Sequence, residues 1–166
     1  MIHLYTGDGG GKTTSALGIA MRALGHDKKV IMIQFMKGRK DTGEYKIQKK
    51  LKNFKVYQFG RKEFIRPVDM PTRKDKDMAK KGLEFIKKVM KEKPYLLILD
   101  EINLAAAVNL LKVQDVVDIL KNKPKSVHVI MTGRFAPKEF KKISDIVTIV
   151  DDVKRVERAA QKGIEY

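Results

Sequence analysis

A glycine-rich loop near the start of the chain constrains the fold more than any other feature. The loop Gly7-Asp-Gly-Gly-Gly-Lys-Thr-Thr14 follows a short apolar run, residues 2–5, and precedes the apolar-rich residues 15–24. Glycines allow backbone N–H groups to turn towards an anion with no Cβ in the way. A helix that begins at the loop directs the positive end of its dipole to the same place. The order strand, glycine loop, Lys-Thr and helix therefore predicts a phosphate-binding loop, here called the phosphate loop (residues 7–14).

The phosphate loop is one residue shorter than the common motif, which is G-x-x-x-x-G-K-[ST]. Counting back from Gly11, the slot of the first glycine falls on Thr6, so the loop reads G-x-x-x-G-K-T. We expect Lys12 to bridge phosphate oxygens and Thr13 to place its hydroxyl on a Mg²⁺ ion. The predicted nucleotide-binding residues of the loop are Gly7, Asp8, Gly9, Gly10, Gly11, Lys12, Thr13 and Thr14.

Two carboxylates follow a later apolar run, Tyr95-Leu-Leu-Ile-Leu-Asp-Glu101. In phosphate-loop proteins a buried strand delivers such carboxylates to the magnesium near the phosphates. Asp100 then fits a direct or water-mediated Mg²⁺ partner, and Glu101 fits a metal-associated or catalytic carboxylate. The alternative is that the two acids cap the next helix. Their pairing with the phosphate loop favours the metal site.

A third candidate residue is Arg134, which follows the apolar run 127–131 and Thr132-Gly133. Ligands of open α/β sheets bind at the carboxyl ends of strands, where Arg134 would lie. A contact with phosphate is its functional interpretation. A surface arginine is the alternative.

Strand-like and helix-like stretches alternate along the whole chain. Further strands are expected at residues 28–35, 54–59 and 146–150, and further helices at 76–92, around 113–120 and after Pro137. This alternation predicts an α/β fold with a mostly parallel, doubly wound sheet and helices on both faces. We expect residues 1–166 to form one nucleotide-binding domain, with 150–166 as a charged C-terminal tail. Residues 61–76 are expected to be a functional loop on the active face, or a disordered linker.

Composition excludes several classes of protein. The 166 residues contain no cysteine, so disulfides, thiol catalysis and cysteine metal sites are excluded. No apolar run approaches the roughly 20 residues of a membrane span, which leads us to expect a cytoplasmic protein. The formal net charge of +16 suits polyanionic ligands, nucleic acid included. Lysines that are spread along the chain favour a solvated surface over a dedicated nucleic-acid site.

Several stretches together resemble the P-loop type corrinoid adenosyltransferases. In order, they are Thr6-Gly-Asp-Gly-Gly-Gly-Lys-Thr-Thr14, Ala23-Leu-Gly-His26, Gln34-Phe35 with Lys37-Gly38, Gly43-Glu44, Leu99-Asp-Glu-Ile-Asn103, His128 through Thr132-Gly-Arg134, and Gln161-Lys-Gly-Ile-Glu-Tyr166. The short phosphate loop and the terminal Gln-Lys-Gly-Ile-Glu-Tyr are the most specific parts. The family's Gly-x-Gly-Phe-x-Trp stretch corresponds here to residues 60–66, which carry no tryptophan.

The resemblance implies a RecA-like P-loop NTPase fold and a transferase that uses ATP and Mg²⁺. Reduced cobalt of a corrinoid attacks the ribose 5′ carbon of ATP, and the whole triphosphate leaves, with the nucleotide reversed relative to ordinary P-loop ATPases. The implied roles are charge stabilisation by Lys12, Thr13-bound Mg²⁺ and Arg134, a nucleotide-sugar contact by Arg22, and a metal contact by Glu101. The family also suggests a homodimer and leaves a reductase partner for the cobalt open.

Two other functions fit the residues: a RecA-like ATPase that binds nucleic acid, and a small-molecule or nucleoside kinase. The short loop and the terminal motif favour the adenosyltransferase. For the second substrate we expect residues 59–73 to line its site, with Phe59 and Phe64 as apolar groups that keep water from the cobalt. The alternative for Phe64 is a place in the core.

Overall fold

Six parallel strands form one sheet in the computed structural model, which describes residues 1–62, 71–156 and 159–166. The strands are β1 (Ile2–Thr6), β2 (Val30–Phe35), β3 (Phe54–Phe59), β4 (Leu96–Asp100), β5 (His128–Thr132) and β6 (Ile146–Ile149). Their order is β3-β2-β4-β5-β1-β6, and each neighbouring pair is parallel. The expected α/β fold with a parallel sheet is confirmed.

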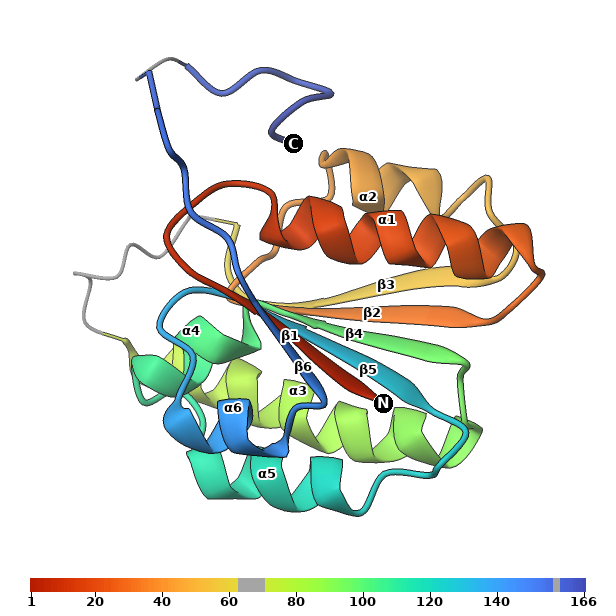
Figure 1. Ribbon diagram of the computed structural model, residues 1–166, viewed down its shortest axis with the longest axis vertical. Helices are drawn as coiled ribbons and strands as arrows, with labels where there is room; N and C mark the ends of the chain where they lie inside the picture. Colours follow the sequence, from red (N-terminus) through yellow and green to blue (C-terminus); the bar gives the residue numbers. More distant parts are fainter. Residues whose placement is uncertain (63–70, 157–158) are drawn as a thin grey trace.

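Helices cover both faces of the sheet (Figure 1). One face carries α1 (Lys12–Gly25) and α2 (Gly43–Ile47), and the other carries α3 (Arg73–Glu92), α4 (Ile102–Ala107), α5 (Val113–Lys121) and α6 (Lys138–Ile143). The chain thus has the doubly wound arrangement of a RecA-like P-loop protein. Within the described ranges, no helix combines the length and the apolar character that a membrane crossing requires.

The inner strands β2 and β4 are buried on both sides because their sequences are nearly continuous apolar runs, whereas the edge strands β3 and β6 keep exposed residues. In β2, Val30 and Met32 pack in the cluster under α1, whereas Ile31 and Ile33 pack in the cluster under α3. The sheet therefore separates two cores. Because all strands run the same way, the loops that follow β1, β2, β4 and β5 meet at one edge, and the candidate site lies there.

The segment after β3 is more regular than expected at its end. Helix α3 begins at Arg73, so the expectation of an irregular segment up to residue 76 was wrong for its last residues. Thr72 and Asp75 form a capping box: the Thr72 hydroxyl accepts the Asp75 N–H at 3.3 Å, and an Asp75 oxygen accepts the Thr72 N–H at 2.9 Å. This pair fixes where the helix starts. Phe64 lies outside the described residues. Phe59 is half-buried and packs against Phe85 of α3, with ring centroids 5.5 Å apart.

Asp75 also ties the loop after β3 to the start of α3. Its buried carboxylate accepts hydrogen bonds from Arg61 Nε at 2.7 Å and Nη2 at 3.1 Å, besides those from Thr72. Burial alone would raise the pKa of Asp75, but the hydrogen bonds from Thr72 and Arg61 lower this pKa below its usual value. The ionised carboxylate is therefore the form that the fold stabilises.

We predict that Asp75→Asn lowers the free energy of unfolding by about 1–3 kcal/mol, since it removes an acceptor for charged and backbone donors. A carboxyl group with a lowered folded-state pKa stabilises the folded protein fully at pH values above its unfolded-state pKa of about 3.9. This contribution is lost as the pH falls through the folded-state pKa. Urea unfolding as a function of pH should thus show a difference between the proteins that is full near neutral pH and shrinks in acid. Asp77→Asn, at an exposed position of the same helix, is the control; an equal loss in both variants would contradict the assignment.

Candidate nucleotide-binding and active site

Four loops bring most of the predicted site residues together at the carboxyl edge of the sheet. The phosphate loop follows β1, Lys37 follows β2, Glu101 follows β4 and Arg134 follows β5. Direct contacts join Thr13 to Asp100, and Arg134 to the phosphate loop. Lys12 and Arg134 are also close enough to Glu101 to shift its pKa.

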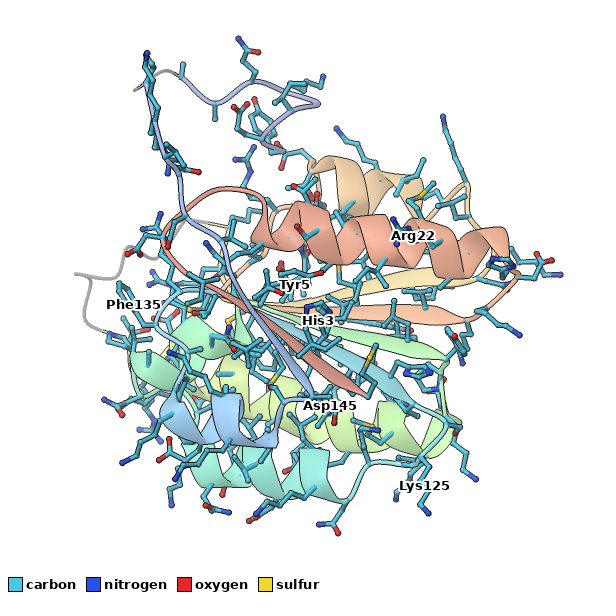
Figure 2. The ribbon with its side chains drawn as sticks, viewed as in Figure 1. His3, Tyr5, Arg22, Lys125, Phe135 and Asp145 are labelled. Carbon is cyan, nitrogen blue, oxygen red and sulfur yellow. The ribbon has the colours of Figure 1, made fainter. Side chains whose placement is uncertain are left out.

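Arg22 is not part of this group. It lies ten residues after Lys12 on α1, about 15 Å along the helix axis. It lines a hollow with His26 and Tyr95, and Tyr95 precedes the amino end of β4. Figure 2 shows Arg22 on the half of α1 that is remote from the phosphate loop. The expectation that Arg22 approaches the nucleotide sugar has no contact in the structure to support it.

The phosphate loop is wrapped around the Lys12 ammonium. Lys12 is 8% exposed, and its Nζ donates to the carbonyl oxygens of Gly7 at 2.7 Å and Gly9 at 2.6 Å. Burial lowers the pKa of Lys12, and the nearby Glu101 opposes that shift. No side chain of the described residues caps the start of α1. The first N–H groups of α1 therefore stand beside Lys12 without a cap, as an anion site requires.

The Asp100 carboxylate is fully buried and accepts four hydrogen bonds. Its Oδ1 accepts from Thr13 Oγ1 at 2.8 Å and Thr132 Oγ1 at 2.7 Å, and its Oδ2 accepts from Gln34 Nε2 at 3.1 Å and Lys37 Nζ at 2.7 Å. Burial alone would raise the pKa of Asp100, but Lys37 and the two threonine hydroxyls hold this pKa below its usual value. The ionised carboxylate has about four acceptor positions, and all are used.

Glu101 differs from Asp100 in backbone conformation, in hydrogen bonding and in the direction of its pKa shift. Its backbone is left-handed, with φ 59°, and its N–H donates to Thr132 Oγ1 at 3.1 Å. The Glu101 carboxylate is half-buried, and its Oε2 would lie 3.2 Å from a Cβ at Gly133. The carboxylate accepts no hydrogen bond from the part of the chain that the structure describes. Burial and the charge of Asp100 raise the pKa of Glu101.

The chemistry of these groups suits a hard divalent cation. The Thr13 hydroxyl donates its hydrogen bond to Asp100, so the lone pairs of the hydroxyl oxygen remain for a metal. The Glu101 carboxylate adds two oxygens with open acceptor positions. Oxygen donors of this kind are what Mg²⁺ prefers. At Asp100 itself, a direct metal bond requires one of the four donors to leave, which favours a role for Asp100 in orienting the Thr13 hydroxyl.

Arg134 lies at the rim of the phosphate loop. Its Nη2 donates to the carbonyl oxygen of Asp8 at 3.1 Å, and its Nε is 3.8 Å from Asp8 Oδ1. The Arg134 side chain is 40% exposed, so part of the guanidinium remains accessible to a ligand. Its contact with the loop favours the functional interpretation over a surface arginine.

Three members of the site, Gln34, Lys37 and Thr132, were not among the predicted site residues, although each lies in a stretch that carries the family resemblance. A polar residue inside the otherwise apolar run Val30–Phe35 is the sequence signal that could have revealed Gln34, which the structure buries fully. Gln34 Nε2 also donates to Glu44 Oε1 at 3.1 Å, and Gln34 Oε1 accepts from Gln58 Nε2 at 2.9 Å. A chain of hydrogen bonds therefore runs from β3 through β2 to the carboxylate behind Thr13.

Gly7 and Gly9 are required by a contact inside the protein. A Cβ at Gly7 would meet the carbonyl oxygen of Val150 at 2.4 Å, and one at Gly9 would meet Asp151 Cα at 2.7 Å. The glycines were expected to make room for phosphate. At these two positions they make room for the chain that follows β6.

Comparison with known proteins identifies the family. Residues 1–166 match the family described as "ATP:corrinoid adenosyltransferase BtuR/CobO/CobP". The chain belongs to this family. A corrinoid adenosyltransferase from a Sinorhizobium species is 33% identical over 175 residues, which span all of this chain and 80% of that protein. Corrinoid adenosyltransferases of Escherichia coli K12 (33% over 172 residues) and Pseudomonas aeruginosa (30% over 170 residues) also align with the whole chain, which covers 85% and 83% of their lengths.

We predict that Lys37→Met costs about 1–3 kcal/mol of unfolding free energy, because it leaves the buried Asp100 carboxylate without its cation. The Lys37 side chain is 26% exposed, so the cost falls below that of a fully buried pair. Urea unfolding measures the change, and Lys40→Met, at an exposed position three residues on, should have little effect. A Lys37→Met protein as stable as wild type would show that Thr13, Gln34 and Thr132 stabilise the Asp100 carboxylate without a cation.

Proposed function

We propose that this protein transfers the 5′-deoxyadenosyl group of ATP to the Co(I) centre of a corrinoid and releases triphosphate. The observation that carries this proposal is the phosphate loop with Lys12 and Glu101 at the carboxyl edge, in a chain that belongs to the corrinoid adenosyltransferase family over its full length. The family also gives the substrates, ATP and a corrinoid. A RecA-like ATPase or a kinase with another substrate is not favoured.

In this reaction the electron pair of Co(I) forms the bond to the ribose 5′ carbon. The bond between that carbon and its oxygen breaks, and its electron pair leaves with the triphosphate. Cobalt thereby changes formally from Co(I) to Co(III). The nucleophile carries no proton, so the protein needs no general base, and charge develops on the leaving group. Catalysis by the chain therefore consists of positioning and of stabilising that charge.

The phosphate loop and the cationic groups that contact it supply that stabilisation. The Lys12 ammonium and the Arg134 guanidinium both donate to carbonyl oxygens of the phosphate loop, and the uncapped N–H groups of α1 begin where that loop ends. Two loop carbonyl oxygens hold the Lys12 ammonium within the loop, and the third N–H of an ammonium can donate to a phosphate oxygen. The reversed orientation of the nucleotide remains a prediction from the family resemblance.

The proposed metal-holding residues are Thr13 and Glu101, with Asp100 behind Thr13. A bound Mg²⁺ supplies divalent charge at the oxygens of the leaving triphosphate. Thr13 can act as a ligand because its proton is directed to Asp100. Glu101 can act as a ligand because its turned backbone keeps it out of the Asp100 network.

A pocket of about 150 Å³ next to Lys37 is the proposed start of the corrinoid site. Loops after β2 and β3 line it together with the last two residues of the chain, and Arg61 and Lys62 belong to the segment that was expected there. Phe135, directly after Arg134, adds an aromatic ring that is 55% exposed at the same edge of the sheet (Figure 2). An exposed ring suits the apolar face of a corrinoid. The homodimer, the reductase partner and the cytoplasmic location remain predictions.

The first test of the function is product identity. With ATP, Mg²⁺ and chemically reduced corrinoid, we expect an adenosylcorrinoid spectrum and triphosphate in equal amounts. Lys12→Ala should weaken ATP binding about tenfold or more, since it removes a charge-assisted contact of roughly 1.5–3 kcal/mol. Lys125→Ala, at an exposed position on the opposite side of the sheet (Figure 2), is the matched control. ADP as the product would instead identify a kinase or an ATPase.

Glu101→Gln tests the metal site. The substitution keeps the volume and removes the charge, so we expect an intact fold, a higher Mg²⁺ concentration for half-maximal rate, and a lower rate at saturation. Titration of the rate with Mg²⁺ at fixed ATP measures both, and circular dichroism checks the fold. Unaltered Mg²⁺ dependence at full rate would make Glu101 a structural acid only.

A further inference from the structure

The chain that leaves β6 occupies the outer side of the phosphate loop. This C-terminal segment (residues 150–156) accepts hydrogen bonds from three consecutive N–H groups of the loop. The Asp8 N–H donates to Asp151 Oδ1 at 3.2 Å, the Gly9 N–H to the carbonyl oxygen of Val150 at 2.8 Å, and the Gly10 N–H to Asp152 Oδ1 at 2.9 Å. Two of the three acceptors are carboxylates. They are anions on N–H groups of a loop whose proposed ligand is also an anion.

The approach of the C-terminal segment to the loop is built into the sequence. Gly7 and Gly9 are the glycines that a Cβ would drive into residues 150–152, at 2.4 Å and 2.6 Å. At Gly10 the nearest atom to a Cβ would be Asp152 Oδ1 at 3.9 Å, so that side of the loop is open apart from the carboxylate. The backbone contact at Gly9 is thus tightly packed, whereas the Asp152 side chain stands at the open end.

We propose that Asp152, with Asp151, is an internal anion of the phosphate loop: it occupies loop N–H groups while no nucleotide is bound, and the polyphosphate of ATP displaces it. This inference rests on the proposed function only in that the loop binds a polyphosphate. The Asp152 carboxylate then acts as a competitor of the substrate and helps to set the affinity for ATP.

The charges nearby support displacement of Asp152 over a shared site. A triphosphate carries several negative charges, and two carboxylates that are hydrogen-bonded to the same loop repel it. Asp152 has another partner at hand, because its Oδ2 is 3.2 Å from Arg155 Nη1. Asp152 can therefore leave the Gly10 N–H and remain paired. Arg155 moves with the segment, so the ion pair survives the exchange.

The C-terminal end of the chain lies at the proposed corrinoid pocket. The chain that carries Asp152 ends at Tyr166, whose ring lies under the Arg39 guanidinium with 4.6 Å between the charge centre and the ring centroid. Both Arg39 and Tyr166 line the 150 Å³ pocket.

Asp152→Asn and Asp152→Ala test the proposal, with Asp115→Asn on the exposed side of α5 as the charge-matched control. Isothermal calorimetry is carried out with tripolyphosphate, ATP and adenosine. We expect tripolyphosphate and ATP to bind roughly tenfold more tightly to Asp152→Asn, and more tightly still to Asp152→Ala, because a competing charged hydrogen bond is lost. Adenosine affinity and the control variant should not change. The gain should shrink in high salt, since salt screens the charge.

The opposite outcome is clear. If Asp152 only supports the loop, both substitutions weaken polyphosphate binding or leave it unchanged, and the inference is overturned. If wild type binds neither tripolyphosphate nor ATP, the proposed function fails as well, so the two failures are distinguishable. Trypsin cleavage after Lys154 and Arg155, located by mass spectrometry, provides a second readout. Tripolyphosphate should accelerate it if the segment is displaced, and protection would contradict displacement.

Discussion

The buried carboxylate of Asp100 is the group on which the site depends. Its four donors come from four places in the chain: Thr13 on α1, Gln34 on β2, Lys37 after β2 and Thr132 on β5. A buried charge is very costly unless it is paired and fully hydrogen-bonded. Any movement of one loop against another would therefore leave part of Asp100 unsatisfied. The carboxylate holds the phosphate loop in register with the neighbouring strands.

Two adjacent acids obtain different roles from one change in backbone direction. Asp100 ends a strand and lies inside the network, whereas Glu101 has φ 59° and turns out of it. Burial favours a raised pKa at both carboxyl groups. The hydrogen bonds and the charge of Lys37 lower the pKa of Asp100 in spite of burial, whereas burial and the charge of Asp100 raise the pKa of Glu101. Environments that shift the pKa values of two neighbouring titratable groups in opposite directions are typical of functional sites. Here they separate the residue that orients Thr13 from the residue that remains open to a metal.

The fold and the centre of the site could be predicted from sequence because their determinants are local. Continuous apolar runs indicate buried parallel strands, and the phosphate loop and Asp100-Glu101 are contiguous motifs. The contacts of Lys37, Gln34 and Thr132 with Asp100 could not be predicted, because they depend on strand order. Gln34 meets Asp100 only because β2 pairs with β4 in a register that sets these residues side by side. Likewise, the helix start at Arg73 depends on a capping box that also needed Arg61 from across the loop.

The sheet order also explains why the C-terminal segment lies on the phosphate loop. β6 pairs with β1 in parallel, with Thr6 opposite Ile149, so both chains leave the sheet at the same edge and side by side. The residue after β6 then donates its N–H to Thr6 at 2.7 Å, and the next residues meet the loop. In a parallel sheet the segments that follow neighbouring strands emerge at the same edge, where ligands bind. Topology therefore brings the carboxylates at the first two positions beyond Val150 to the phosphate loop, and glycine at positions 7 and 9 is the local condition that lets them reach it.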